Sequence, residues 1–192
     1  MTSPLSIRRA DLSDLGTVIA LAHEIWHRHY PGIITAEQID YMLARGYSRD
    51  ALAPFATDPT RGLALAERDA QPLGFAAWYP PGEPHRMKLD KLYVLPLAHG
   101  QGVGRALIEH VAHAARRAGC RTLTLNVNRK NTGSVRAYER CGFRIVKRGD
   151  FPIGNGCSHH CLGCCGAARS NGDGSGAIMP MPARAICSMR GS

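Results

Sequence analysis

The chain contains 192 residues, of which 24 are Lys or Arg and 15 are Asp or Glu, so its formal net charge is +9 at pH 7. This length favours one domain with a single core; the lack of an apolar run of about eighteen residues and of a signal-peptide-like amino terminus predicts a cytoplasmic protein without a membrane partner. The basic residues are not gathered with aromatic residues into one dense patch, which argues against nucleic acid and favours a small anionic ligand.

The amino-terminal part predicts one strand followed by three helices. Residues 5–9 are apolar enough for a short strand. Apolar residues from Leu15 to Trp26 recur at spacings of three and four, which indicates a helix with one face in the core. Thr35 and Gln38 have the spacing of a capping box at the start of a second helix, and residues 48–56 predict a short third one.

Two groups of metal-type side chains need a separate test. The string HEIWH at residues 23–27 matches H-E-x-x-H, in which two His one helical turn apart bind zinc. No third ligand follows nearby and the same helix carries the apolar face, so we expect no zinc site there. The second group lies near the carboxyl end: Cys157, His159, His160, Cys161, Cys164 and Cys165. These residues are too close together for the separated ligand pairs of a structural zinc site, and we predict no metal cofactor.

The middle of the chain predicts a sheet and the helices that cover it. Residues 61–69 and 71–80 read as an antiparallel hairpin, and 87–94 as a central strand. A long helix then follows three glycines. Another strand over 120–128, a helix capped by Asn131 and a strand over 143–149 complete the pattern.

The three glycines, at 100, 102 and 104, indicate a phosphate-binding loop. They stand where a strand ends and a helix begins, and the first turn of a helix offers unpaired N–H groups and the positive end of its dipole. The dinucleotide fingerprint requires a glycine where Arg105 stands and an acidic residue where the next strand ends in Asn126 and Asn128. The nucleotide P-loop string does not occur, so both of these classes are excluded.

The loop resembles the pyrophosphate loop of the GCN5-related N-acetyltransferases (GNAT), whose signature is Gln or Arg, two residues, Gly, one residue, then Gly or Ala. Here His99 takes the first position, followed by Gly102 and Gly104. Residues 122–146, TLTLNVNRKNTGSVRAYERCGFRIV, resemble the fifth strand of that family, its next helix with Asn and Tyr, and its terminal Gly-Phe. The likeness covers residues 5–156 and implies an α/β fold with a mixed central sheet flanked by helices.

The resemblance also implies the activity and the residues that perform it. An acetyl group would pass from acetyl-CoA to an amine of a small molecule or peptide by direct attack. Tyr138 matches the family's general acid, and Asp90 and Glu83 are the candidates for the base. Trp26 and Tyr30 would line the acceptor pocket or pack in the core. The expected cofactor contacts are Leu92, Tyr93, Val94, His99, Gly100, Gln101, Gly102, Val103, Gly104, Arg105, Asn126 and Asn131.

The carboxyl end departs from this pattern. Residues 157–192 are rich in Cys, Gly, Ser and Pro and show no helical or strand period, so we expect a domain over 1–156 followed by a disordered or aberrant tail. The family's final strand is expected to be missing or replaced, as by a frameshift. The alternative function is therefore a non-catalytic acyl-CoA-binding module; the sequence leaves the acceptor and a possible homodimer open.

Overall fold

The computed structural model describes residues 3–32, 34–154 and 157–167. The strands in these ranges are β1 (Ser6–Arg9), β2 (Gly62–Arg68), β3 (Gln71–Tyr79), β4 (Arg86–Val94), β5 (Thr122–Asn128), β6 (Arg144–Gly154) and β7 (Cys157–Ala167). The helices are α1 (Leu15–His29), α2 (Ala36–Gly46), α3 (Arg49–Thr57), α4 (Val103–Arg117) and α5 (Thr132–Arg140), with 3-10 turns η1 (Leu12–Asp14) and η2 (Pro96–Ala98). None of the helices described is long and apolar enough to cross a membrane.

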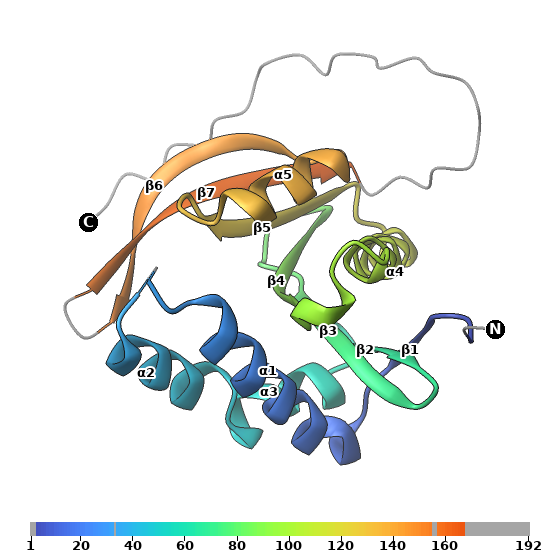
Figure 1. The fold of residues 1–192 in the computed structure, drawn as a ribbon. Coiled ribbons are helices and arrows are strands. Elements are labelled where there is room, and N and C mark those ends of the chain that lie inside the picture. Colours follow the sequence, from blue (N-terminus) through green and yellow to red (C-terminus); the bar gives the residue numbers. More distant parts are fainter. Residues whose placement is uncertain (1–2, 33, 155–156, 168–192) are drawn as a thin grey trace.

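The strands form one mixed sheet in the order β1-β2-β3-β4-β5-β7-β6. Neighbouring strands are antiparallel except for β4 and β5, which are parallel. The parallel pair requires a crossover, and α4 supplies it. The sheet is therefore the mixed sheet that the sequence predicted, with β4 at its centre (Figure 1).

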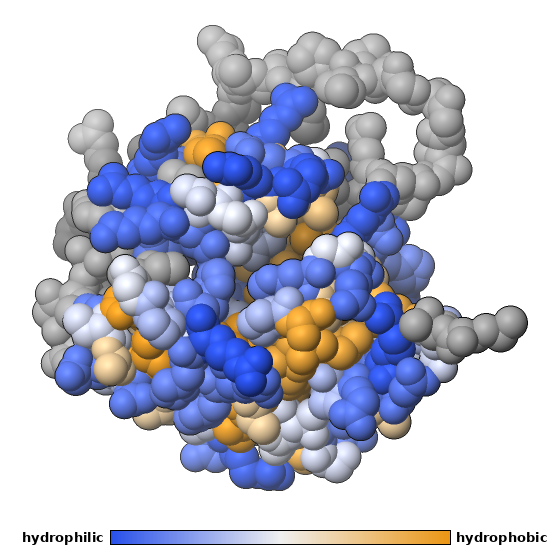
Figure 2. Space-filling view, in the orientation of Figure 1, coloured by the Kyte–Doolittle hydropathy of each residue, from blue (hydrophilic) through white to orange (hydrophobic). Residues whose placement is uncertain are grey.

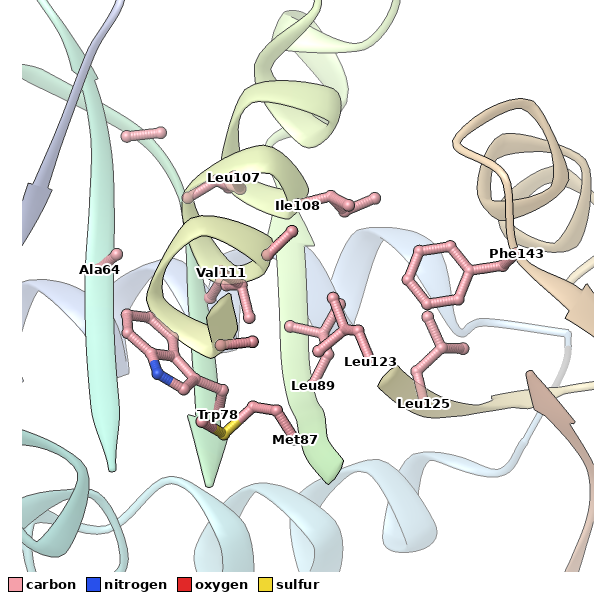
Figure 3. Packing of buried hydrophobic residues seen from close by; sticks show 14 of the residues in the cluster. Ala64, Trp78, Met87, Leu89, Leu107, Ile108, Val111, Leu123, Leu125 and Phe143 are labelled. Atoms are coloured by element: carbon pink, nitrogen blue, oxygen red, sulfur yellow. The ribbon is translucent and has the colours of Figure 1, made fainter. Parts of the chain in front are cut away.

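Helices cover both faces of the sheet and bury two apolar clusters. On one face, α1, α2 and α3 pack through residues such as Val18, Leu43 and Leu52, all at most 1% exposed. On the other face, α4 places Leu107 and Val111 against the sheet (Figure 3). This face also carries α5, which packs through partly buried side chains. The apolar helix faces read from the sequence are thus the faces that bury the core.

Local capping signals in the sequence produce the expected helix starts. Thr35 Oγ1 accepts a hydrogen bond from Gln38 N at 3.3 Å, and Gln38 Oε1 accepts one from Thr35 N at 3.1 Å. Asn131 Oδ1 accepts from Ser134 N at 3.2 Å at the start of α5. Both predicted caps are confirmed.

The final strand was expected to be missing or replaced, and the first of these alternatives is wrong. Residues 157–167 form β7, which pairs with β5 on one side and with β6 on the other. Within β7, Cys164 is buried in the core at 3% exposure, and burial raises the pKa of its thiol. It therefore serves as a small apolar side chain. The rest of the predicted tail, 168–192, lies outside the described residues.

Candidate active site

The site begins where β4 and β5 separate. Their parallel pairing covers only three positions and ends at Lys88 and Thr124. Beyond that point β4 continues to Val94 and β5 to Asn128, and the residues of both strands line one cavity. A parallel pair that opens in this way leaves backbone groups of both strands without a ladder partner, so they are available to a ligand.

The end of β4 directs particular backbone groups into this opening. Leu95 N donates to Leu73 O at 2.8 Å across the β3–β4 pair. Bonded and non-bonded pairs alternate along antiparallel strands, so Tyr93 also bonds to β3, whereas Leu92 and Val94 direct their N–H and C=O groups away from β3. The cleft therefore receives the backbone groups of Leu92 and Val94.

Two cavities meet along this cleft. The narrow cavity, about 140 Å³, lies between the separated ends of β4 and β5 and extends to α1, with Ile25, Tyr30 and Asp90 among its lining. The wide cavity, about 640 Å³, lies along the glycine loop and the starts of α4 and α5. The residues that line both cavities are His29, Leu92, Val94, His99, Asn131, Ser134 and Tyr138.

The glycine loop forms one side of the wide cavity. Gly100 and Gly102 have φ values of +77° and +81°, a conformation that favours glycine. Gly102 is the N-cap of α4 and gives it no side-chain cap. The N–H groups of the first turn, including those of Val103 and Gly104, are thus left for an anion. Arg105 also lines this cavity and forms an ion pair with Glu109 at 2.8 Å.

His99, which stands in place of the family's Gln or Arg, turns back toward the central strand. Its Nε2 lies 3.0 Å from Val94 O, and because a carbonyl oxygen only accepts, Nε2 donates. Gln101 lines neither cavity: its Nε2 donates to Leu97 O, and its Oε1 accepts from Arg68. Both side chains thus tie the glycine loop to neighbouring segments by hydrogen bonds.

α5 supplies the polar groups on the opposite side of the cleft. Asn131 and Tyr138 line both cavities, seven residues apart on nearly the same helix face, as the sequence predicted. The Tyr138 ring meets the edge of Phe143 at 5.8 Å between ring centroids. Burial raises the pKa of the Tyr138 phenol well above its usual value, so the phenol stays protonated at neutral pH.

The structure separates the two candidate bases. Asp90 lines the narrow cavity and stands at a β-bulge, because Lys91 pairs with Ala77 while Leu89 pairs with Trp78. Its carboxylate forms ion pairs with Lys91 at 2.8 Å and with Lys88 at 3.7 Å. Glu83 lines neither cavity.

Glu83 instead lies before the first residue of β4, at the end away from the glycine loop. It forms an ion pair there with Arg86, and its side chain is 54% exposed. A nine-residue strand spans roughly 26–30 Å, so Glu83 is remote from the residues at the far end of β4.

Asn126, expected as a cofactor contact, lines the narrow cavity from β5 and does not line the wide one. Gly74 and His29 are among the contributors that sequence reasoning missed. Gly74 on β3 lets the strands approach closely, since a Cβ there would lie 2.5 Å from Tyr93 O. An isolated glycine inside a strand is the signal that could have identified it. His29, at the end of α1, lines both cavities, and no local signal marks it. Of the two expected aromatic residues, Tyr30 lines the narrow cavity and Trp26 is core.

The H-E-x-x-H string does not form a metal site in the part of the chain that the structure covers. The His23 and His27 rings stack with centroids 6.0 Å apart, and His27 Nε2 contacts Asp40 at 3.3 Å. No group of three or more metal-type side chains occurs among the described residues. The side chains of residues 157–163, which include four of the predicted metal-type residues, are not among those that the structure describes.

Both polar and apolar side chains line the wide cavity. Figure 2 shows hydrophilic residues over α5, whereas apolar residues gather near η2. Arg105 of α4 and Arg140 of α5 both line the wide cavity. An anionic ligand there would meet two guanidinium groups in addition to the start of α4.

Comparison with known proteins shows which family the chain belongs to. The model of the acetyltransferase (GNAT) family matches residues 20–143. The chain belongs to the GNAT family. An uncharacterised N-acetyltransferase of Mycobacterium tuberculosis is 30% identical over 149 residues, which cover 78% of this chain and 93% of that one. The peptidyl-lysine N-acetyltransferase YjaB of Escherichia coli is 30% identical over 146 residues, covering 76% and 86%.

The fold agrees with that of solved GNAT structures. The PaiA N-acetyltransferase of Thermoplasma acidophilum, crystallised with coenzyme A, superposes with a TM-score of 0.72 at 21% identity over 85% of this chain and 99% of that one. The protein is an acyl-CoA-binding N-acetyltransferase that transfers an acetyl group to an amine. The non-catalytic alternative is not favoured.

Proposed function

We propose that this GNAT enzyme uses acetyl-CoA to acetylate a primary amine at the end of an unbranched alkyl chain, such as the lysine side chain of a peptide. The observation that carries the proposal is the separation of β4 from β5 beyond Lys88 and Thr124. It joins a wide cavity suited to an anionic cofactor to a narrow cavity suited to a slender amine.

The cofactor would occupy the wide cavity with its phosphates on the glycine loop. The N–H groups of Val103 and Gly104 belong to the first turn of α4, where they are available to bind an anion. Arg105 and Arg140 add positive charge. The pantetheine arm would run along the cleft toward Leu92 and Val94. Its amides would bond to the backbone N–H and C=O groups of β4 that do not pair with β5. The thioester would then reach the junction of the two cavities.

The chemistry follows from the groups at that junction. The amine nitrogen attacks the thioester carbon, the C–S bond breaks, and the thiolate leaves. The N–H of Val94 would stabilise the developing oxyanion, because the alternation along β4 directs it into the cleft. Tyr138 would donate a hydrogen bond to the thiolate. Its raised pKa disfavours full proton transfer to a thiolate whose conjugate acid has a pKa of about 8.5.

Asp90 is better placed than Glu83 to accept the amine proton. Asp90 lines the narrow cavity, and the ion pairs of its carboxylate with Lys88 and Lys91 fix the orientation of that group. It would attract the ammonium form of the acceptor and accept the proton through a water molecule.

Two observations support the acceptor class. The narrow cavity has less than a quarter of the volume of the wide cavity, and Tyr30 and Tyr93 give it aromatic walls along which an alkyl stem can pack. The relative YjaB is named a peptidyl-lysine N-acetyltransferase. Both fit an amine at the end of a flexible stem.

Steady-state assays with acetyl-CoA would test the proposal. Purified enzyme should acetylate a lysine peptide with a higher kcat/KM than the same peptide carrying Nε-dimethyllysine, which lacks a transferable N–H. Propionyl-CoA would serve as the competing acyl donor and should react more slowly. Binding of CoA without turnover of any alkylamine would contradict the proposal and favour a binding module. The cytoplasmic location and the homodimer remain predictions.

A further inference from the structure

A hydrogen bond joins the two sides of the cleft at the junction of the cavities. Asn131 Nδ2 lies 2.9 Å from His29 Nε2, across 102 residues of sequence. His29 stands at the end of α1, and Asn131 is the N-cap of α5. Both side chains line the narrow and the wide cavity. This contact, the His29–Asn131 bridge, therefore connects the wall nearest the acceptor to the helix nearest the cofactor.

The partners of Asn131 determine which form of His29 can make the bridge. Asn131 Oδ1 accepts from Ser134 N, so the amide group that faces His29 is the NH₂. An NH₂ group donates only, and His29 Nε2 must therefore accept with its lone pair. The bridge requires a neutral imidazole with its proton on Nδ1, and protonation of Nε2 would break it.

The surroundings of His29 favour this neutral form. Burial, and to a smaller extent the proximity of His99, lower the pKa of His29. Tyr30 of the same helix end meets the imidazole edge-on at 5.0 Å between ring centroids. The other ionisable groups that line the narrow cavity are Asp90 and Tyr93 of β4 and Tyr138 of α5. At neutral pH the imidazole is therefore available as an acceptor.

We infer that His29 is a positioning residue for acetyl transfer, whose neutral imidazole orients the Asn131 amide toward the cofactor and whose protonation weakens cofactor binding. An amide NH₂ carries two N–H donors, and the bridge uses one. The other is then held at the junction of the cavities, where the pantetheine arm would pass. The inference rests on the cofactor site proposed above.

The geometry distinguishes this role from that of a catalytic base. A base must offer a free lone pair to the proton it accepts. The Nε2 lone pair of His29 already accepts from Asn131, and Nδ1 carries the proton of the neutral ring. His29 therefore acts through Asn131.

Calorimetric titration with CoA at pH 7.5 and pH 5.5 would test the inference on the full chain and three variants. His29→Gln retains a neutral acceptor at a similar reach and cannot titrate, whereas His29→Leu removes the acceptor. His23→Gln is the control, because His23 lies on the same helix and lines neither cavity.

At pH 7.5, His29→Leu should weaken CoA binding roughly three- to tenfold, the loss expected for one hydrogen bond, while His29→Gln stays within about twofold of the native chain. Acidification to pH 5.5 should weaken binding by the native chain and by His23→Gln more than binding by His29→Gln, by up to about tenfold, because the loss grows as the pH falls below the pKa of His29. His99 is present in every variant, so this difference isolates His29.

Three results would overturn the inference: native affinity in His29→Leu, an equal loss in His29→Gln and His29→Leu, or an equal pH dependence in His29→Gln and the native chain. If His29→Leu fails to fold, as judged by thermal melting, the pH comparison with His29→Gln still decides. If the native chain does not bind CoA at pH 7.5, the proposed cofactor site fails, and the inference fails with it.

Discussion

Tyr138 shows how one side chain can contribute to catalysis without being indispensable. It lines both cavities, and burial keeps its phenol protonated. The leaving thiolate has a conjugate acid with a pKa of about 8.5 and leaves readily without full protonation. A hydrogen bond from Tyr138 would lower the barrier, while Val94 and the cofactor contacts would still operate in its absence.

Replacing Tyr138 with Phe should lower kcat roughly ten- to hundredfold, which is no more than the smallest contribution of a full general acid, because Tyr138 donates a hydrogen bond without transferring its proton. The Kd for CoA, measured by calorimetry, should change less than about twofold, because one hydroxyl is lost and the ring remains. A loss of kcat without a loss of CoA affinity would show that Tyr138 acts in the chemical step.

Tyr79→Phe is the matched control for this change. Tyr79 ends β3, lines neither cavity, and packs instead beneath the charged groups of Arg61 and Lys88. Its loss should leave kcat unaltered. An unaltered kcat in Tyr138→Phe would remove Tyr138 from the mechanism.

At the scale of single elements, the sequence predicted best where a signal is local. The cap at Thr35, the glycines at 100 and 102 and the cap at Asn131 each act within a few residues, and each is found as expected. The contact of Asn131 with His29 depends on two helices meeting in space, so no local pattern could indicate it.

The glycine loop also provides a test at this scale. Gly102→Ala places a Cβ on a residue with a φ of +81°, which should cost about 1–2 kcal/mol of folding free energy. The strained loop should also move the start of α4 and weaken CoA binding by about tenfold. Thermal melting and calorimetry measure the two effects.

Gly104→Ala is the matched comparison two residues away. Gly104 lies inside α4, and a Cβ there would meet Val94 Cγ2 at an ordinary 3.7 Å. Alanine should stabilise the helix by up to about 1 kcal/mol and change CoA affinity little. Equal losses in both variants would show that the space above the loop, rather than its backbone conformation, is what matters.

For the whole molecule, the sequence indicated the order and type of the elements up to β6 but not β7. CSHHCLGCCGA contains none of the β-branched or aromatic residues that favour strands, and it does not alternate. β7 nevertheless lies between β5 and β6: β6 pairs with its residues from Cys157 to Cys165, and β5 pairs with those from Cys161 to Ala167. Tertiary pairing overrides weak local preference here, and a strand of this kind is recognised only once its neighbours are placed.

This position of β7 leads to a prediction about truncation. A chain that ends at residue 167 should melt cooperatively within a few degrees of the full chain, because it retains all seven strands of the described sheet. A chain that ends at residue 156 loses β7 and with it the buried Cys164. β5 and β6 would then lose their shared partner strand, and each unpaired backbone group that stays buried costs about 1–3 kcal/mol.

We therefore expect the shorter chain to show no cooperative transition by circular dichroism and no CoA binding by calorimetry. The loss would reach the site because β5 supplies Asn126 and Asn128 to the narrow cavity, and β5 is held on that side by β7. Melting and binding by the 156-residue chain that match those of the 167-residue chain would contradict this account. The sheet would then fold and bind CoA without β7.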